Sequence, residues 1–284
     1  MKRHCTGVLR LQMRRAVESK TLPYAFLALM ALITVCFVQS CLMFWGHDVG
    51  ALPSAATIWV GNGWRSNAGL MTFVTSYLLF PLSAALFADC LYEDRSRGAA
   101  YLIASRTSLW GYLLSGALCS FVIAFVMTLL ALLLSQAVAL MAFPATASPD
   151  AYYVMYDLAA TSDLGFSLLE GQPFSGLLFS NRYLYNLLYC VYDAAFAGAM
   201  ALASYALSLF VRRNRLVVLG LPTMLLLMLS AVVPPTCSVA GFLLPQYGSA
   251  GTPEWLVLAT PALIAAVSLL VVCVSSKARG DVLR

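Results

Sequence analysis

Asp193 is the one ionisable side chain that lies well inside an apolar run of this 284-residue chain. A charged residue in the middle of a bilayer costs about 3 kcal/mol or more, so such a residue is by default a candidate for transport or gating. Asn186 lies two helical turns before it, and Gln39 and Gln136 are the other strongly polar residues in apolar runs. These four residues could line a polar pathway. The alternative is that Asp193 lies near the outer interface or is hydrogen-bonded locally.

Residue patterns that support enzymatic chemistry are missing from the sequence. The chain has no Gly-x-x-x-x-Gly-Lys-Ser/Thr phosphate loop and no Gly-x-Ser-x-Gly elbow. Its two histidines, His4 and His47, lie outside the apolar runs, and its eight cysteines show no Cys-x-x-Cys spacing. We therefore expect no enzyme active site, no cofactor and no metal. Any dependence on ATP must come from another chain.

Long apolar runs predict six membrane-spanning helices. The sequence is 61% hydrophobic and only 10% charged, whereas a soluble domain carries about 25% charged residues. A run of about 20 apolar residues is long enough to cross about 30 Å of hydrocarbon. We expect spans at about 22–44, 69–88, 109–141, 183–211, 216–233 and 255–275. The predicted fold is an all-α polytopic membrane protein, with a cytoplasmic segment at 1–20, a transmembrane domain at 21–276 and a cytoplasmic tail at 277–284.

The positive charges predict the orientation of this bundle. With six spans, every Lys and Arg except Arg65 and Arg182 falls on one side of the membrane. Because cytoplasmic loops carry the excess of positive residues, both ends of the chain are predicted to be cytoplasmic. The net charge of +5 is then a consequence of topology and does not indicate a nucleic-acid partner.

The segment before the first span has the pattern of an amphipathic helix. Leu9, Met13, Ala16 and Val17 recur at helical spacing, and Arg10, Arg14, Arg15 and Glu18 take the other face. This pattern is typical of a helix in the membrane interface. We expect it to pack against the bundle. The alternative is a basic anchor that only sets the topology.

The longest inner loop runs from Asp89 to Trp110 and is predicted to be the main cytoplasmic contact surface. It contains the apolar residues Ala99, Leu102 and Ile103, which need a covering surface in a cytoplasmic segment. Around them stands a mixed-charge rim of Glu93, Asp94, Arg95, Arg97 and Arg106. The apolar residues would contact a partner protein, or else the membrane interface or the inner helix ends of this chain.

The same loop carries a family resemblance. An acidic residue after the second span, a glycine at Gly98, an apolar helix, a short Ser/Arg turn and then the third span resemble this region of type-2 ABC exporter permeases. The Leu184-Tyr-Asn-Leu-Leu stretch, the small residues of the fourth span, Arg213-Asn-Arg and Leu221-Pro are similar to the fourth and fifth spans of that family. Gly116 departs from the resemblance, because a basic residue is expected early in the third span.

The resemblance implies a permease subunit of an ATP-driven exporter in the cell membrane of a bacterium. Its partners would be a second permease half, identical or related, and two copies of a cytosolic ABC ATPase. The ATPase-coupling residues would be Glu93, Gly98, Leu102, Ile103 and Arg106, with a short coupling helix from Gly98 to Ile103. The class of cargo stays open. The alternatives are a six-span secondary transporter or channel, and a non-transporting membrane scaffold or immunity protein.

Overall fold

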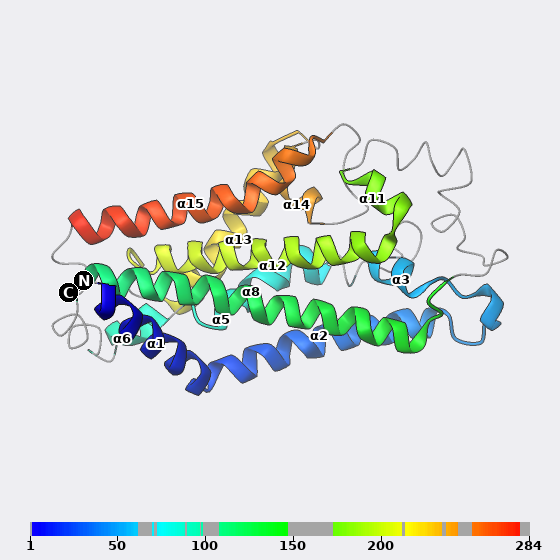
Figure 1. Cartoon of the computed structure of the whole chain (residues 1–284), viewed down its shortest axis with the longest axis horizontal. Coiled ribbons are helices and arrows are strands. Elements are labelled where there is room, and N and C mark those ends of the chain that lie inside the picture. The colour runs from blue at the N-terminus through cyan, green and yellow to red at the C-terminus, as the bar shows by residue number, and fades with distance from the viewer. Residues whose placement is uncertain are drawn as a thin grey trace.

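The structure, a computed structural model, describes residues 2–61, 70, 73–88, 90–96, 98, 108–146, 173–211, 214–234, 237–243 and 252–278. Within these ranges every regular element is a helix (Figure 1). Six helical stretches there are long and apolar enough to span a membrane: Thr21–Met43, Val74–Arg95, Leu109–Ala142, Arg182–Leu207, Arg215–Val232 and Glu254–Ser276. The predicted all-α fold with six spans is confirmed.

Shorter helices lie between the long ones along the chain. The described helices are α1 (Lys2–Glu18), α2 (Thr21–Met43), a 3-10 turn (Val49–Ala51), α3 (Ala55–Gly61), a π-helical turn (Val74–Leu78), α5 (Leu79–Ala85), α6 (Cys90–Ser96), α8 (Leu109–Ala142), α11 (Ser175–Ser180), α12 (Arg182–Leu207), α13 (Arg215–Val232), α14 (Val239–Phe242) and α15 (Glu254–Ala278). The second span thus comprises the π-helical turn, α5 and α6. A turn at 86–88 follows α5, and α6 lies beyond the expected end of the span at 88.

Side-chain caps set the start of three spans. The Ser108 hydroxyl accepts a hydrogen bond from the Gly111 amide, and the Asn181 carbonyl oxygen accepts one from the Leu184 amide. The Asn214 side chain does the same for the amide of Leu216. These caps satisfy amide groups that the first helical turn leaves without an internal partner. The polar residue before each apolar run therefore fixes where α8, α12 and α13 begin.

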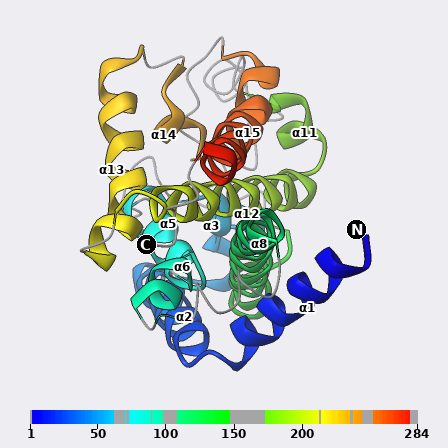
Figure 2. The ribbon, with the colours of Figure 1, turned by 90° about the vertical axis from the view of Figure 1, so that its left-hand side faces the viewer.

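Helix α12 lies at the centre of the bundle, between α8 on one side and α15 on the other (Figure 2). Its small residues allow close approach: a Cβ added to Gly198 would lie 3.1 Å from the Phe121 ring of α8. Two turns farther along α12, a Cβ added to Gly116 of α8 would overlap the hydroxyl of Tyr205. Gly116, the position that departs from the permease pattern, is therefore required by the packing of Tyr205.

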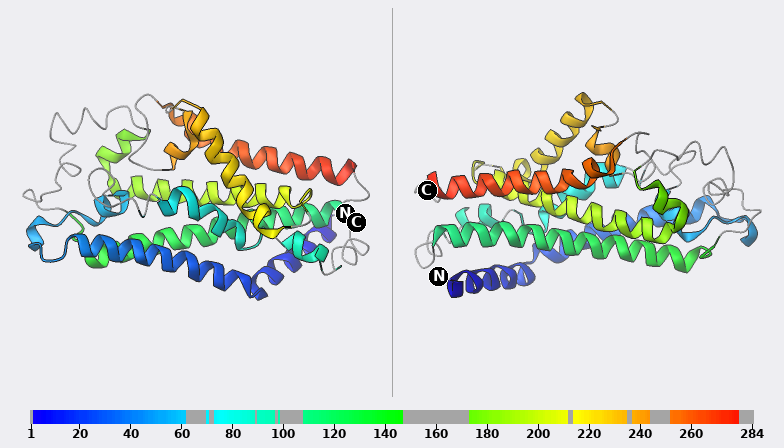
Figure 3. Two further views of the ribbon diagram at one scale, coloured as in Figure 1. Left: turned by 180° about the vertical axis from the view of Figure 1, so that it is seen from behind. Right: turned by 45° about the horizontal axis from the view of Figure 1, so that its top comes forward.

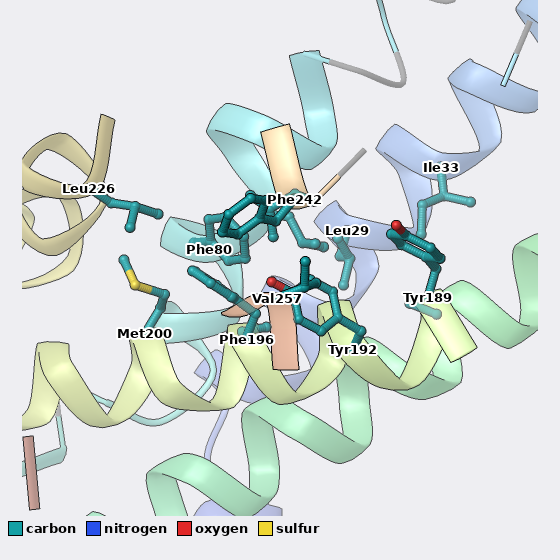
Figure 4. Close-up of a cluster of buried hydrophobic side chains, with 14 of the residues drawn as sticks. Leu29, Ile33, Phe80, Tyr189, Tyr192, Phe196, Met200, Leu226, Phe242 and Val257 are labelled. Carbon is teal, nitrogen blue, oxygen red and sulfur yellow. The ribbon is translucent and has the colours of Figure 1, made fainter. Parts of the chain in front are cut away.

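The largest apolar cluster joins α12 to seven other described helices. The rings of Phe80 of α5 and Phe196 of α12 pack against each other, tilted by 42° and with centroids 5.1 Å apart (Figure 4). Leu29, Leu226 and Val257 bring α2, α13 and α15 to the same cluster. Burial of such side chains from water and lipid into one packed core holds the helices in a fixed arrangement.

Helix α1 packs on the bundle beside one end of α8 (Figure 3). The first residues of α1 and the last turn of α15 lie at this same end, which we call the inner end after the charge-based orientation (Figure 1). The buried face of α1 consists of Val8, Gln12 and Ala16. Three residues of the expected apolar face, Leu9, Met13 and Ala16, pack in one apolar cluster with residues of α8. The expectation was wrong at Val17, which is 71% exposed.

Candidate functional site

Three consecutive charged residues of α6 each contact a different part of the bundle. They are Glu93, Asp94 and Arg95. In an α-helix, successive side chains point about 100° apart, since one turn takes about 3.6 residues. Three neighbours can therefore reach three separate helices, and here they do.

Asp94 is the buried centre of this arrangement, with 1% of its surface exposed. Nη1 of Arg15 in α1 donates to its Oδ2 at 3.0 Å, and Nη2 of Arg15 donates to Oδ1. The hydroxyl of Tyr112, in the first turn of α8, donates to Oδ2 at 2.5 Å. A bidentate arginine–carboxylate ion pair is among the strongest polar interactions in proteins. It ties α1, α6 and α8 together at the inner end.

The charge state of Arg15 is secured by this contact. The hydrogen bond from its side chain to Asp94 raises the pKa of the Arg15 guanidinium above its already high ordinary value, and partial burial opposes that effect. Arg15 is therefore positively charged at every pH the protein meets.

The two neighbours of Asp94 contact the opposite side of the bundle. Nη1 of Arg95 donates to the carbonyl oxygen of Ser208 at 2.6 Å, directly after the last turn of α12. A cation at this position is favourable because the last carbonyls of a helix are unpaired and carry partial negative charge. Glu93 lies 4.0 Å from Arg215 at the start of α13. That pair is partly exposed and contributes little to stability.

We call Arg15, Glu93, Asp94, Arg95, Tyr112 and Arg215 the inner charge cluster. Asp94 and Arg95 were expected in a charged rim around a docking surface. In the structure they form hydrogen bonds with other helices of this chain instead. Gly98 is exposed with a φ of +69°, and its amide donates to the Arg95 carbonyl at 3.0 Å. This is the left-handed conformation with which glycine often ends a helix. Leu102, Ile103 and Arg106 lie outside the described residues.

The opposite, outer end of the bundle holds a second polar cluster, built around the short helix α3. The side-chain amide of Asn186 donates to the carbonyl oxygen of Ala56 at 3.0 Å and to Oε1 of Gln136 at 2.8 Å. The amide of Gln136 in turn donates to the Ala55 carbonyl at 3.3 Å. Two residues expected to line a pathway are thus brought together, and both hold the backbone of α3.

Further contacts fasten α3 to the outer ends of α8 and α12. Nε1 of Trp59 donates to the Ser135 hydroxyl at 2.7 Å, and Nη1 of Arg182 donates to the Thr57 hydroxyl at 3.3 Å. The backbone amide of Ala55 donates to the carbonyl oxygen of Pro144 at 2.9 Å. Helix α3 is therefore fixed to the outer ends of both α8 and α12. We call Ala55, Ala56, Thr57, Trp59, Ser135, Gln136, Arg182 and Asn186 the outer polar cluster.

The other two predicted pathway residues lie apart from this cluster. Asp193 is buried in the middle of α12, two turns farther along the helix than Asn186, and its Oδ1 has no hydrogen-bond partner among the described residues. Gln39 is half-buried near the outer end of α2. The four residues therefore do not form one continuous patch.

The inner charge cluster was not predicted from the sequence. The amphipathic pattern places Arg15 on the solvent face of its helix, and the charge pattern places Asp94 in an exposed rim. The one available signal was an acidic residue directly after an apolar run, where a charge is costly without a partner. Nothing in the sequence says which of the inner basic residues reaches it.

Among the residues that the structure describes, no three His, Cys, Asp or Glu side chains gather as a metal site would require. No protein family model, curated protein or solved structure matches the chain. The fold and its clusters define a six-span helical membrane protein. Charged residues connect its helices at the inner end, and the short helix α3 is hydrogen-bonded to α8 and α12 at the outer end.

Proposed function

We propose that this protein is the permease subunit of an ATP-driven exporter of the type-2 ABC class. It would form the path for cargo together with a second permease half, and two copies of a cytosolic ATPase would drive it. The proposal rests on three features. The first is the plan of six spans with an amino-terminal helix, the second is the resemblance of the inner loop and of the fourth and fifth spans to those of type-2 ABC exporter permeases, and the third is the inner charge cluster.

The inner charge cluster is the observation that carries the proposal. The segment expected to dock the ATPase follows α6 directly. Glu93, Asp94 and Arg95 of α6 contact α13, the pair α1 and α8, and α12 respectively. A displacement of α6 would therefore be passed to α1, α8 and α12, because charge-assisted hydrogen bonds of this kind resist separation. The partly exposed Glu93–Arg215 pair adds only a weak contact with α13. A subunit that converts ATPase motion into helix motion needs such a connection.

The outer polar cluster, at the opposite end of the helix bundle, supports the same proposal. A pathway that opens alternately to the two sides must be closed at one end while it is open at the other. Helix α3 is held on α8 and α12 through hydrogen bonds to its backbone and hydroxyl groups. Such bonds are replaceable by water at modest cost. This closure can therefore be reversible.

A pull-down with two variants tests the proposal. Leu102→Asp combined with Ile103→Asp places two charges at the centre of the expected docking surface, where a desolvated contact would lose several kcal/mol. The matched control is Val17→Asp, which adds a charge to an exposed apolar residue of α1. We expect all variants to insert into the membrane, and only the double variant to lose the ATPase. A double variant that retains the ATPase and full export contradicts the docking assignment.

One observation favours a second candidate function, a six-span secondary transporter. Asp193 is a buried acid in a span, and such residues often serve as ion or proton sites in secondary transporters. The two functions differ in their energy source. Transport into vesicles that contain the purified chain alone, driven by an ion gradient without ATP, would favour the secondary transporter.

A further inference from the structure

Helix α1 carries an exposed stripe of side chains that no helix in the described part of the chain covers. Arg10, Arg14 and Val17 are exposed and follow one another at spacings of four and three residues, so they share one face of the helix. The buried side of α1, which includes Val8 and Ala16, lies opposite this face, and α1 itself lies on the outside of the bundle (Figure 2). The stripe therefore faces the surroundings of the protein.

The ends of α2 and α8 show where the bilayer lies along the bundle. Phe44 follows the last turn of α2 and Phe143 follows that of α8, and their ring centroids are 5.9 Å apart. The outer ends of these two helices are therefore level. Helix α2 has 23 residues, about the length that crosses the hydrocarbon, so its first residue marks the inner membrane surface. Helix α8 has 34 residues and extends about 16 Å farther inward, at about 1.5 Å per residue.

Helix α1 crosses α8 at the level of this inner surface. The thiol of Cys119 donates to the carbonyl oxygen of Leu9, with 3.9 Å between sulfur and oxygen. Cys119 lies about 15 Å from the start of α8, at about 1.5 Å per residue. Ala16 packs in one apolar cluster with Cys119 and Ile123. Both halves of α1 therefore lie near the level at which α2 enters the bilayer, so the exposed stripe faces the headgroup region of the surrounding lipid.

The exposed side of α1 has an excess of positive charge. Arg10, Arg14 and Lys20 are exposed, and Glu18 is the one exposed acid among residues 7–20. Glu18 lies 2.7 Å from Arg14, but an ion pair this exposed is weak and leaves the arginine available to other anions. Anionic lipids of the inner leaflet attract basic residues near the membrane surface. The apolar Val17 fits the boundary between headgroups and acyl chains.

We propose that the exposed stripe of α1 binds the headgroups of anionic phospholipids in the inner leaflet. The guanidinium groups of Arg10 and Arg14 contact phosphate oxygens, because their forked N–H groups match phosphate geometry. Val17 contacts the first carbons of the acyl chains. Lipid that holds α1 also bears on the inner charge cluster, because Arg15 of the same helix is bound to Asp94. The contact requires neither ATPase nor cargo and is independent of the exporter function.

A fluorescent probe on α1 tests the lipid contact. In a background without other cysteines, Val17→Cys of the full chain carries an environment-sensitive fluorophore, and the protein is placed in nanodiscs of phosphatidylcholine with increasing phosphatidylglycerol. As phosphatidylglycerol rises, we expect the emission to move to shorter wavelength and lipids with a spin-labelled headgroup to quench it more strongly. An emission typical of water at every composition, or one that does not respond to phosphatidylglycerol, contradicts the proposal.

Charge variants of the same labelled chain give the matched comparison. Arg10→Gln with Arg14→Gln should lower the apparent affinity for phosphatidylglycerol about tenfold or more, because each basic residue at an anionic surface contributes roughly a factor of five. Arg10→Lys with Arg14→Lys keeps the charge and should retain most of the affinity, and Glu18→Gln should raise it. All these side chains are largely exposed, so the variants should unfold at the wild-type temperature in detergent. A glutamine pair that titrates like the lysine pair would overturn the proposal.

Discussion

Nη1 of Arg15 lies 3.0 Å from Oδ2 of Asp94, although the two residues are 79 positions apart in the sequence. The contact joins the amino-terminal helix to the last turns of the second span. Tyr112 adds the start of α8 to the same carboxylate. The inner end of the bundle is therefore one connected unit, and a force applied to α6 acts on α1 and α8 together.

Removing Arg15 should destabilise the protein. Arg15→Ala leaves the buried carboxylate of Asp94 without its counter-charge, which costs about 3–5 kcal/mol in a fully buried pair. Because the Arg15 side chain is 38% exposed, water compensates part of this loss, and we expect about 1–3 kcal/mol. The measurement is the apparent free energy of unfolding in detergent micelles.

Arg14 provides the matched control for this experiment. It pairs with Glu18 on the exposed face of α1, so Arg14→Ala should leave the stability of the protein unchanged. Equal losses from the two substitutions would show that the helix, rather than the buried pair, responds to the loss of an arginine. That result would contradict the role given to Asp94.

Gly116 should not tolerate even one added methyl group. Gly116→Ala places a Cβ against the hydroxyl of Tyr205, and overpacking of this kind costs about 1–3 kcal/mol. Gly220→Ala is the control, since nothing lies within 4 Å of its Cβ position and alanine favours a helix more than glycine does. Thermal unfolding of both variants compares them directly. A neutral Gly116→Ala would mean that α8 and α12 lie farther apart than described.

The spans were predictable from the sequence because hydrocarbon thickness sets a minimum length for an uncharged run. The pairing of Gln136 with Asn186 was partly predictable, since both are polar residues in apolar runs. Their common partner, the backbone of α3, was not, because α3 belongs to a loop and its contact is through main-chain carbonyls. The Arg15–Asp94 pair was also unpredictable, as several inner basic residues fit the same charge pattern.

Helix α3 should loosen when its partners are removed. In a background without other cysteines, Ala56→Cys tests access to a position that is 1% exposed. Adding Asn186→Ala removes the donor to the backbone carbonyl of that position, which costs about 1–3 kcal/mol. Since each 1.4 kcal/mol corresponds to about a tenfold change in an equilibrium, labelling of the introduced cysteine by a thiol reagent should accelerate several-fold or more. Asn214→Ala at the inner end should not change the rate, and equal rates in all three proteins would contradict the outer closure.

The orientation of the bundle predicts which positions a reagent can reach from outside the cell. Single cysteines placed in the 150–180 segment should react with an impermeant thiol reagent, and cysteines placed at Ser96 or Asn214 should not. The expectation follows from the positive residues that flank the latter two positions. Labelling of Ser96→Cys or Asn214→Cys in intact cells would refute the assigned orientation.

Purification of the tagged chain from its native membrane in mild detergent tests the exporter function most directly. The account predicts that a P-loop ATPase accompanies it, that the complex contains two permease halves and two copies of the ATPase, and that ATP hydrolysis disappears when the ATPase is removed. It also predicts that the Leu102→Asp, Ile103→Asp variant purifies without that ATPase. A chain that transports its cargo in vesicles with no P-loop ATPase present would contradict the account.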